Sequence, residues 1–238
     1  MMDYRLNLAT RMLTNKKGSL IGAVLAVSIG ILVIHVNFVI FQGIYDAILR
    51  DMTDYRFGDI FITHEEDPTI DRSHLVYTNW FERVQIVQAA TPRLSGNADI
   101  EFRNYGKQTE QFDVPVVGID PVTDVQASRI HTTISDGQYV YARNSIVVGE
   151  TVSENLGGVK VGDNIKLIVI NQWGVEESKR FIVVGISKTA GGQGFDSSVI
   201  VHIDTLRNML DRPNESNSIF VKLNDNDSEG AKELKNQF

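Results

Sequence analysis

The chain has 238 residues, of which 42% are hydrophobic, so it is long enough to bury the core of one or two domains. The formal net charge is -7 and there is no long basic stretch, which argues against nucleic acid as a partner. Because the chain has no cysteine, disulfides, thiolate metal sites and a cysteine nucleophile are excluded.

The first predicted element is a short amphipathic helix over residues 4–13. Its apolar side chains recur at helical spacing near one face, and its two arginines lie elsewhere on the helical wheel. The apolar residues are Leu6, Ala9, Met12 and Leu13, and the basic ones are Arg5 and Arg11. Two interpretations remain open: a helix on the inner membrane surface, or a helical extension of the segment that follows.

Residues 20–45 are predicted to form a transmembrane helix. The segment LIGAVLAVSIGILVIHVNFVIFQGIY contains no Asp, Glu, Lys or Arg and exceeds the ~20 residues that a span needs. A secretory signal is the competing interpretation, but its apolar region is typically about 7–15 residues long. No small-residue cleavage pattern follows the segment here, so we expect it to be retained.

Charges on the two sides of this segment predict its orientation in the cell (inner or plasma) membrane. Basic residues precede it and acidic residues dominate after it. The preceding residues are Arg5, Arg11, Lys16 and Lys17; the following ones are Asp46, Asp51, Asp54 and Asp59, interleaved with Arg50 and Arg56. Because Lys and Arg are retained on the cytoplasmic side, residues 1–19 are expected in the cytoplasm and residues 46–238 outside it.

Within the predicted span, small residues repeat every four positions. Gly22, Ala26 and Gly30 share one face, and Asn37 falls on about the same face because seven residues make nearly two turns. Small residues allow helices to approach closely in lipid, and an amide can form hydrogen bonds between helices. We therefore predict that these four residues form a packing face for other membrane helices.

The region after the span shows mixed helix and strand patterns. A helix over 79–89 is predicted from the Asn79 cap and the spacing of Phe81, Val84 and Val87. The remaining predicted elements, in chain order, are strands at 59–63, 98–104, 112–119 and 145–149, two helical turns at 150–156, a hairpin of 164–171 with 175–185, a strand at 197–203, a helix at 204–211 capped by Asp204, a strand at 217–223 and a helix from 227.

These elements predict an α+β fold. Strand–helix–strand units near both ends of the region suggest a split βαβ layer, formed by residues of about 46–107 and 191–238. The strand-rich block between them, about 108–190, is expected to be an inserted β-rich subdomain.

The glycines of the stretch SIVVGETVSENLGGVKVGDNIKL, residues 145–167, are the strongest candidates for a special backbone role. A phosphate-binding loop would need the Walker pattern with its Lys-Ser/Thr pair, and that pattern is missing. Gly157 or Gly158 can instead end a helix in the left-handed conformation, and Gly162-Asp163 can form the next turn. The glycines are therefore predicted to be structural.

Enzyme chemistry finds little support in the sequence, so we expect a protein that is not an enzyme. The five histidines have no metal-ligand spacing, and no Gly-x-Ser-x-Gly elbow is present. The acidic stretch at 63–71 is interpreted as a solvated loop rather than a cation site. We expect no catalytic, metal or directly bound cofactor site.

Several segments, in the right order behind one span, resemble the MacB/FtsX/LolC-type family of ABC transporter permeases. LATRMLTNKKGSL (8–20) is similar to the start of these proteins, and VVGIDP (116–121) is similar to a later motif. GETVSENLGGVKVGDNIKL (149–167) and FIVVGISKTAGGQGFDSSVIVHIDTLRNML (181–210) resemble segments of their MacB-like periplasmic core domain. Together these similarities cover nearly the whole chain.

The resemblance implies a permease whose first helix is followed by a large extracytoplasmic domain and three more helices. This sequence stops at Phe238 with no further span, so we expect either a fragment or a truncated relative. The implied partners are a cytoplasmic ABC ATPase subunit that uses ATP, a second permease chain in a homo- or heterodimer, and membrane lipid. The implied cargo is a lipoprotein, lipid, peptide or drug.

Two other functions stay open. One is a single-pass, membrane-anchored extracytoplasmic binding or sensor module without transport. The other, a membrane-tethered hydrolase, is weaker because the sequence shows no nucleophile with a matching base.

Overall fold

The computed structural model describes residues 17–63, 70, 74–81, 83–104, 106–189 and 195–224. It separates into two compact units, residues 1–49 and residues 50–238. The helices predicted over 4–13 and from 227 onward lie outside the described residues.

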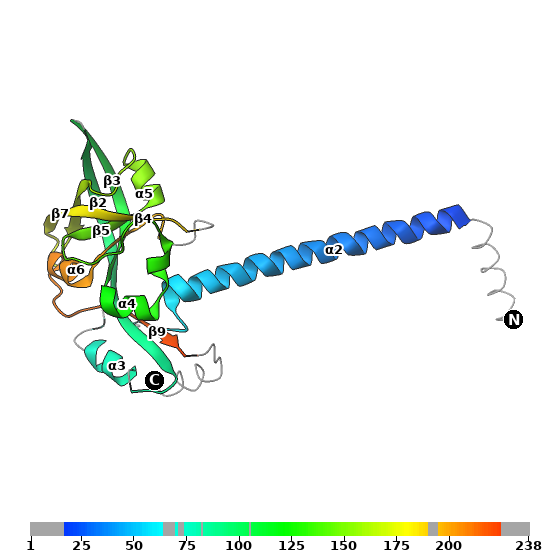
Figure 1. The fold of residues 1–238 in the computed structure, drawn as a ribbon, viewed down its shortest axis with the longest axis horizontal. Coiled ribbons are helices and arrows are strands. Elements are labelled where there is room, and N and C mark those ends of the chain that lie inside the picture. The colour runs from blue at the N-terminus through cyan, green and yellow to red at the C-terminus, as the bar shows by residue number, and fades with distance from the viewer. Residues whose placement is uncertain are drawn as a thin grey trace. The chain divides into compact units, whose positions relative to one another are not determined.

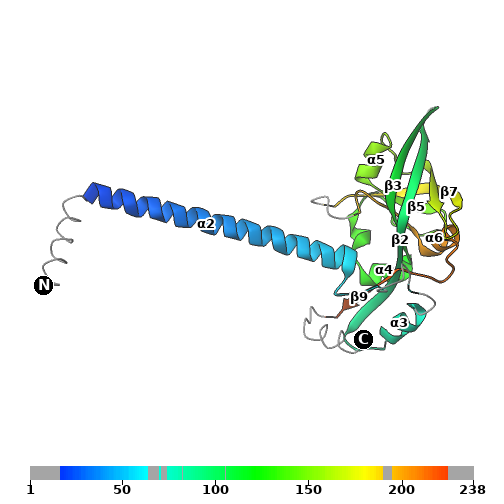
Figure 2. The same cartoon turned by 180° about the vertical axis from the view of Figure 1, so that it is seen from behind.

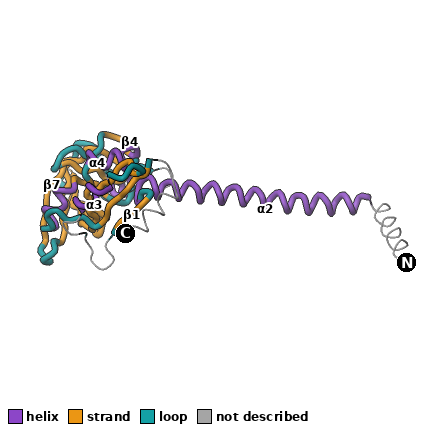
Figure 3. The backbone as a smooth tube through the Cα atoms, turned by 90° about the horizontal axis from the view of Figure 1, so that it is seen from below, coloured by secondary structure: helices purple, strands orange, loops and turns teal. Residues whose placement is uncertain are grey.

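Helix α2 (Lys17–Asp51) is a single uninterrupted helix of 35 residues, coloured purple in Figure 3. It contains the whole predicted span, residues 20–45. By length and composition it can cross a membrane, with a mean hydropathy of 2.6 in its most apolar window. The side chains described for residues 21–45 are exposed within the protein, as expected when lipid is to surround them.

The second unit is built on one nine-stranded sheet with short helices beside it. The strands are β1 (Ile60–Ile62), β2 (Val87–Asn104), β3 (Lys107–Ile119), β4 (Ile134–Gly137), β5 (Ser145–Gly149), β6 (Asn164–Ile170), β7 (Glu176–Ser187), β8 (Val199–His202) and β9 (Ser218–Leu223). The helices are the π-helical turn η1 (Met52–Phe57), α3 (His74–Phe81), α4 (Pro121–Ala127), the 3₁₀ turn η2 (Ile130–Thr133), α5 (Glu150–Asn155) and α6 (Ile203–Leu210).

Six of the strands close into a ring. Going around it, β2 pairs with β3, β3 with β8, β8 with β5, β5 with β7, β7 with β6, and β6 with β2. Closure is possible because β2 has 18 residues: its first half pairs with β9 and its second half with β6 on the same edge. Closing the ring gives each of these strands a hydrogen-bonded neighbour on both sides, although β3 meets β8 only over Val116–Ile119.

Figures 1 and 2, seen from opposite sides, show α5 and α6 on different flanks of the long β2–β3 hairpin. Both helices contribute apolar side chains to the main core: Val152 of α5 with Leu156 directly after it, and Leu206 and Met209 of α6. They pack there against alternate residues of the strands, such as Ile100. The core therefore holds the ring and both helices together as one body.

The helix predicted over 79–89 is wrong. Helix α3 ends at Phe81, and Val87 already begins β2, which pairs with β9 from Val87 to Arg93. The apolar spacing that suggested a helix is real, because Phe81, Val84 and Val87 join one hydrophobic cluster. A turn brings these three side chains together. From Val87 onward, hydrogen bonds to β9 pair the backbone groups that a helix would have paired internally.

Most of the other predicted elements are confirmed. The strands, the helical turns of α5 and the β6–β7 hairpin lie where the sequence placed them, and Gly157 and Gly158 both have positive φ after α5. The cap of α6 is one correction: the N-cap is His202, not Asp204, and His202 Nδ1 accepts the backbone N–H of Asp204 at 3.2 Å. The carboxylate of Asp204 instead pairs with Arg143 and Arg207.

The mixed α/β class is confirmed. The strands of the predicted insert, β5 to β7, hydrogen-bond directly to β8 and β2 within the same sheet. The split βαβ layer and the division at residues 108 and 190 stay predictions.

Candidate functional site

The segment that directly follows α2 is bonded to the domain through its own backbone. The last carbonyls of a helix have no partner inside it. Here the carbonyl of Asp54 accepts the N–H of Arg129 at 3.0 Å, and the carbonyl of Tyr55 accepts Nη1 of Arg93 at 2.8 Å. Gly58 ends the π-helical turn with a φ of +69°, and a side chain there would collide with Phe220 and Val221 of β9.

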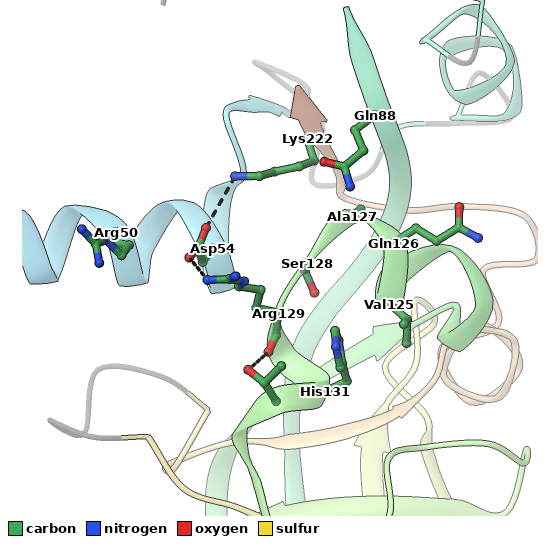
Figure 4. Close-up of a pocket in the computed structure, with 11 residues that line it drawn as sticks. Arg50, Asp54, Gln88, Val125, Gln126, Ala127, Ser128, Arg129, His131 and Lys222 are labelled. Carbon is green, nitrogen blue, oxygen red and sulfur yellow. Dashed lines mark hydrogen bonds and ion pairs between the residues drawn. The ribbon is translucent and has the colours of Figure 1, made fainter. Parts of the chain in front are cut away.

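Side-chain ion pairs reinforce this attachment, as Figure 4 shows. The carboxylate of Asp54 lies 3.4 Å from Nη1 of Arg129 and 3.5 Å from Nζ of Lys222. Lys222 also pairs with Asp59 at 3.4 Å, and Asp59 accepts the backbone N–H of Leu223 at 2.8 Å. Two acidic residues near the end of the helix are thereby linked to η2 and to β9.

These groups border an open pocket of about 690 Å³, which we name the junction pocket. It is lined by Arg50, Asp54, Gln88, Val125, Gln126, Ala127, Ser128, Arg129, His131, Thr132 and Lys222. Most of the wall comes from the end of α4, from η2 and from the two residues between them. The pocket is polar and carries more positive than negative side chains.

A buried charge cluster lies behind this pocket. Asp124 on α4 is fully buried, and its Oδ1 accepts Nη2 of Arg93 at 2.9 Å and Nε at 3.1 Å. Its Oδ2 accepts the hydroxyls of Ser128 at 2.6 Å and Tyr139 at 2.8 Å. The Arg93 guanidinium also lies over the Phe220 ring, 4.2 Å from its centroid. A buried carboxylate with four donors is fully satisfied, so the cluster can hold α4, β2 and the chain at Tyr55 in one arrangement.

The environment of Tyr139 shifts its titration. Desolvation raises the pKa of the Tyr139 phenol well above its ordinary value of 10.0, and the charge of Asp124 and the hydrogen bond to it raise the pKa further. The positive charge of Arg93 acts in the opposite direction and lowers the pKa of Tyr139. The phenol therefore stays protonated and donating throughout the physiological range.

Replacing Tyr139 with phenylalanine is expected to lower the free energy of unfolding by about 1.5 kcal/mol at pH 7, because a hydrogen bond to a carboxylate is lost. Since the folded pKa is raised, this contribution is present below pH 10, the unfolded value, and is lost as the pH rises through the folded pKa. The difference in unfolding free energy between wild type and Tyr139→Phe, measured by urea unfolding, should shrink as the pH rises above 10. A difference that is constant with pH would contradict the assignment.

The four residues of the predicted packing face all lie on α2. Additional side-chain atoms at Gly22 or Gly30 would meet nothing within 4 Å, so space is free for another helix. The amide of Asn37 donates to the Val33 carbonyl of its own helix at 2.8 Å, which leaves its oxygen for a neighbour. Contact of Gly22, Ala26, Gly30 and Asn37 with another membrane helix stays a prediction.

Sequence reasoning missed the groups of the junction pocket and of the buried charge cluster. Arg50, Asp54 and Asp59 were interpreted only as charges flanking the span. Their partners are remote, since Asp54 and Lys222 are 168 positions apart, and no local pattern marks such a pair. Within the described ranges, no three His, Asp or Glu residues gather as metal ligands. Most of the acidic stretch at 63–71 lies outside those ranges.

Comparison with known proteins places this architecture in a family. Residues 20–236 match the family described as MacB-like periplasmic core domain. No curated protein sequence matches at a significant level.

Two solved structures are similar. The extracellular domain of the noncanonic ABC-type transporter YknZ from Gram-positive bacteria aligns with a TM-score of 0.50 at 13% identity, covering 74% of this chain and 91% of that one. The periplasmic region of MacB from Actinobacillus actinomycetemcomitans aligns with a TM-score of 0.48 at 15% identity, covering 68% of this chain and 71% of that one. At this identity the YknZ likeness concerns the fold alone.

The family match covers most of the chain, and one described helix near the N-terminus is long and apolar enough to cross a membrane. Together they indicate a membrane-anchored protein with an extracytoplasmic domain. The chain belongs to the MacB-like periplasmic core domain family, whose domain occurs in ABC transporter permease-type proteins.

Proposed function

We propose that this chain is a membrane-spanning permease subunit of an ABC transporter. The observation that carries the proposal is the family match over residues 20–236, which includes both the apolar helix and the domain. A separate cytoplasmic ATPase subunit uses the ATP, and the chain itself binds no cofactor and is not an enzyme. The cargo that is exported or released is a lipoprotein, lipid, peptide or drug.

The arrangement in the membrane follows from the flanking charges. The basic residues before the span, Lys16 and Lys17 among them, favour a cytoplasmic N-terminus. The packing face formed by Gly22, Ala26, Gly30 and Asn37 contacts other membrane helices, including those of a second permease chain in a homo- or heterodimer. Membrane lipid surrounds the remaining surface of the span.

The junction supplies a route by which ATP-driven motion of the span reaches the domain. The residues after α2 are tied to the domain by two backbone carbonyls and by the ion pairs of Asp54 with Arg129 and Lys222. π-helical segments are rare in proteins, and those that occur are often found at functional sites, which agrees with such a role.

Affinity purification of the tagged full-length protein from its native membrane is the direct test. We expect a nucleotide-binding subunit to co-purify and the complex to hydrolyse ATP. Material that runs alone, with an activity that ignores ATP, would contradict transport and favour a single-pass binding or sensor module.

Substitution of Asp54 tests the coupling step. Asp54→Asn removes both ion pairs, at a cost of about 1 kcal/mol because the partners are partly exposed. We expect the ATPase to stay bound, while the change in protease sensitivity of the domain on adding ATP is reduced. Asp136→Asn, an exposed site on β4, is the matched control. If adding ATP changes the protease sensitivity of the Asp54→Asn domain as much as that of wild type, Asp54 does not couple the span to the domain.

A further inference from the structure

The junction pocket holds positive charge that the protein neutralises only in part. Three cations line it, Arg50, Arg129 and Lys222, against the single carboxylate of Asp54, so the lining carries a net +2 from three positive charges and one negative. Lys222 is further balanced by Asp59 beside the pocket. With Asp59 counted, three positive charges face two negative ones, and the remaining excess of one positive charge rests on the two arginines.

Both arginines have donors to spare. Arg129 uses only Nη1 in a long contact of 3.4 Å to Asp54, and its side chain is 67% exposed. Arg50 forms no ion pair with any residue in the described part of the chain, and Figure 4 shows it without a contact to the other residues drawn. A guanidinium has five N–H donors in a planar fork that matches the oxygens of phosphate or carboxylate.

A neutral polar atom in the same wall also lacks a partner. Nδ1 of His131 is buried and makes no hydrogen bond. Buried polar atoms without partners are uncommon, and each one requires an explanation such as an absent ligand. His131 also lines the pocket, so a ligand bound there would lie close to this residue.

The position of Arg50 in the chain restricts the source of the anion. Arg50 follows Tyr45, the last residue of the predicted span, by five positions, or ~7.5 Å along a helix. The polar headgroup layer is roughly 5–8 Å thick on each side of the hydrocarbon core. Arg50 is therefore at headgroup depth, where lipid phosphates are abundant.

We propose that the junction pocket binds a phosphate group, supplied either by the headgroup of an anionic lipid or as a free phosphate ion. Arg50 and Arg129 hold its oxygens, and the pocket volume of about 690 Å³ admits a headgroup. Such a ligand would add a noncovalent link between Arg50, at the end of α2, and Arg129, just before η2. This inference depends on the membrane anchoring and not on ATP-driven transport.

The test uses the full chain in detergent without any ATPase, so its outcome is separate from that of the proposed transport function. Binding is measured by microscale thermophoresis with three probes: dioctanoyl phosphatidylglycerol, dioctanoyl phosphatidylcholine and inorganic phosphate. We expect phosphatidylglycerol, phosphate or both to bind saturably and more tightly than phosphatidylcholine. Arg50→Gln or Arg129→Gln should each weaken binding about fivefold, and the double variant more than tenfold.

Arg180→Gln, which removes an equal charge from an exposed site on β7, is the matched control and should bind like wild type. Binding of phosphatidylglycerol alone would assign the lipid as the source, and binding of inorganic phosphate as well would show that the free ion suffices. Equal affinity for phosphatidylcholine and phosphatidylglycerol, no binding of any probe, or affinities unaffected by both arginine substitutions would overturn the proposal. Because Arg50 has no described ion pair to lose, its variant stays informative if Arg129→Gln misfolds.

Discussion

Replacing Asp124 with alanine is expected to lower the free energy of unfolding by about 3–5 kcal/mol, because the substitution removes the carboxylate that pairs with the buried Arg93 guanidinium. Both side chains are almost completely excluded from solvent, and four hydrogen-bond donors converge on the carboxylate. For a domain of this size the loss corresponds to a fall in Tm of about 6–20 °C. Thermal unfolding of the full chain followed by circular dichroism measures it.

Two further variants separate the charge effect from a general loss of packing. Asp120→Ala, four residues earlier, removes only the N-cap of α4, where the carboxylate accepts the N–H of Val122 at 3.1 Å, and should cost about 1 kcal/mol. The double variant Arg93→Met/Asp124→Leu removes both charges and should be less destabilised than Asp124→Ala alone. If the double variant is as unstable as the single one, the unpaired arginine is not the cause.

Replacing Gly149 with alanine is expected to cost about 3 kcal/mol or more, the upper end for an overpacked site. The methyl group would overlap the backbone carbonyl of Asp196 and the carbonyl oxygen of Phe195. This backbone cannot withdraw easily, since the Asp196 carbonyl accepts the N–H of Thr151 at 3.0 Å, and its carboxylate accepts the N–H and hydroxyl of Thr189 at 2.8 and 2.7 Å. Urea unfolding of wild type and of Gly149→Ala measures this loss in the free energy of unfolding.

Gly157→Ala is the matched control for this second prediction. Gly157 has a φ of +92°, and nothing lies within 4 Å of an added methyl group, so only the left-handed backbone is unfavourable, by about 1–2 kcal/mol. If both variants lost the same stability, close packing against Asp196 would not be the reason for glycine at position 149.

The glycine-rich stretch at 145–167 shows how far local reasoning reaches. Its strand, helical turns and left-handed glycines were predicted correctly, because steric limits on the backbone act within a few residues. The role of Gly149 could not be predicted in the same way. Its φ is an ordinary -65°, and the requirement for glycine comes from Asp196, which is brought beside it by the fold.

The failure over residues 79–89 has a related cause. Apolar residues at helical spacing predict a helix when only the local pattern is considered. The partner strand β9 lies more than a hundred residues later, and its ladder with β2 decides that the chain is extended from Val87 onward. Long-range pairing of this kind leaves no mark in the segment itself.

The apolar helix α2, the mixed α/β class, most element positions and the resemblance to the family could all be predicted from the residues alone, since hydropathy, periodicity and turn residues act locally along the chain. The closed ring of strands, the buried pair of Arg93 with Asp124 and the junction pocket depend on how the chain packs in three dimensions. Those features join residues up to 168 positions apart, and their energies depend on burial and distance, which no local pattern specifies.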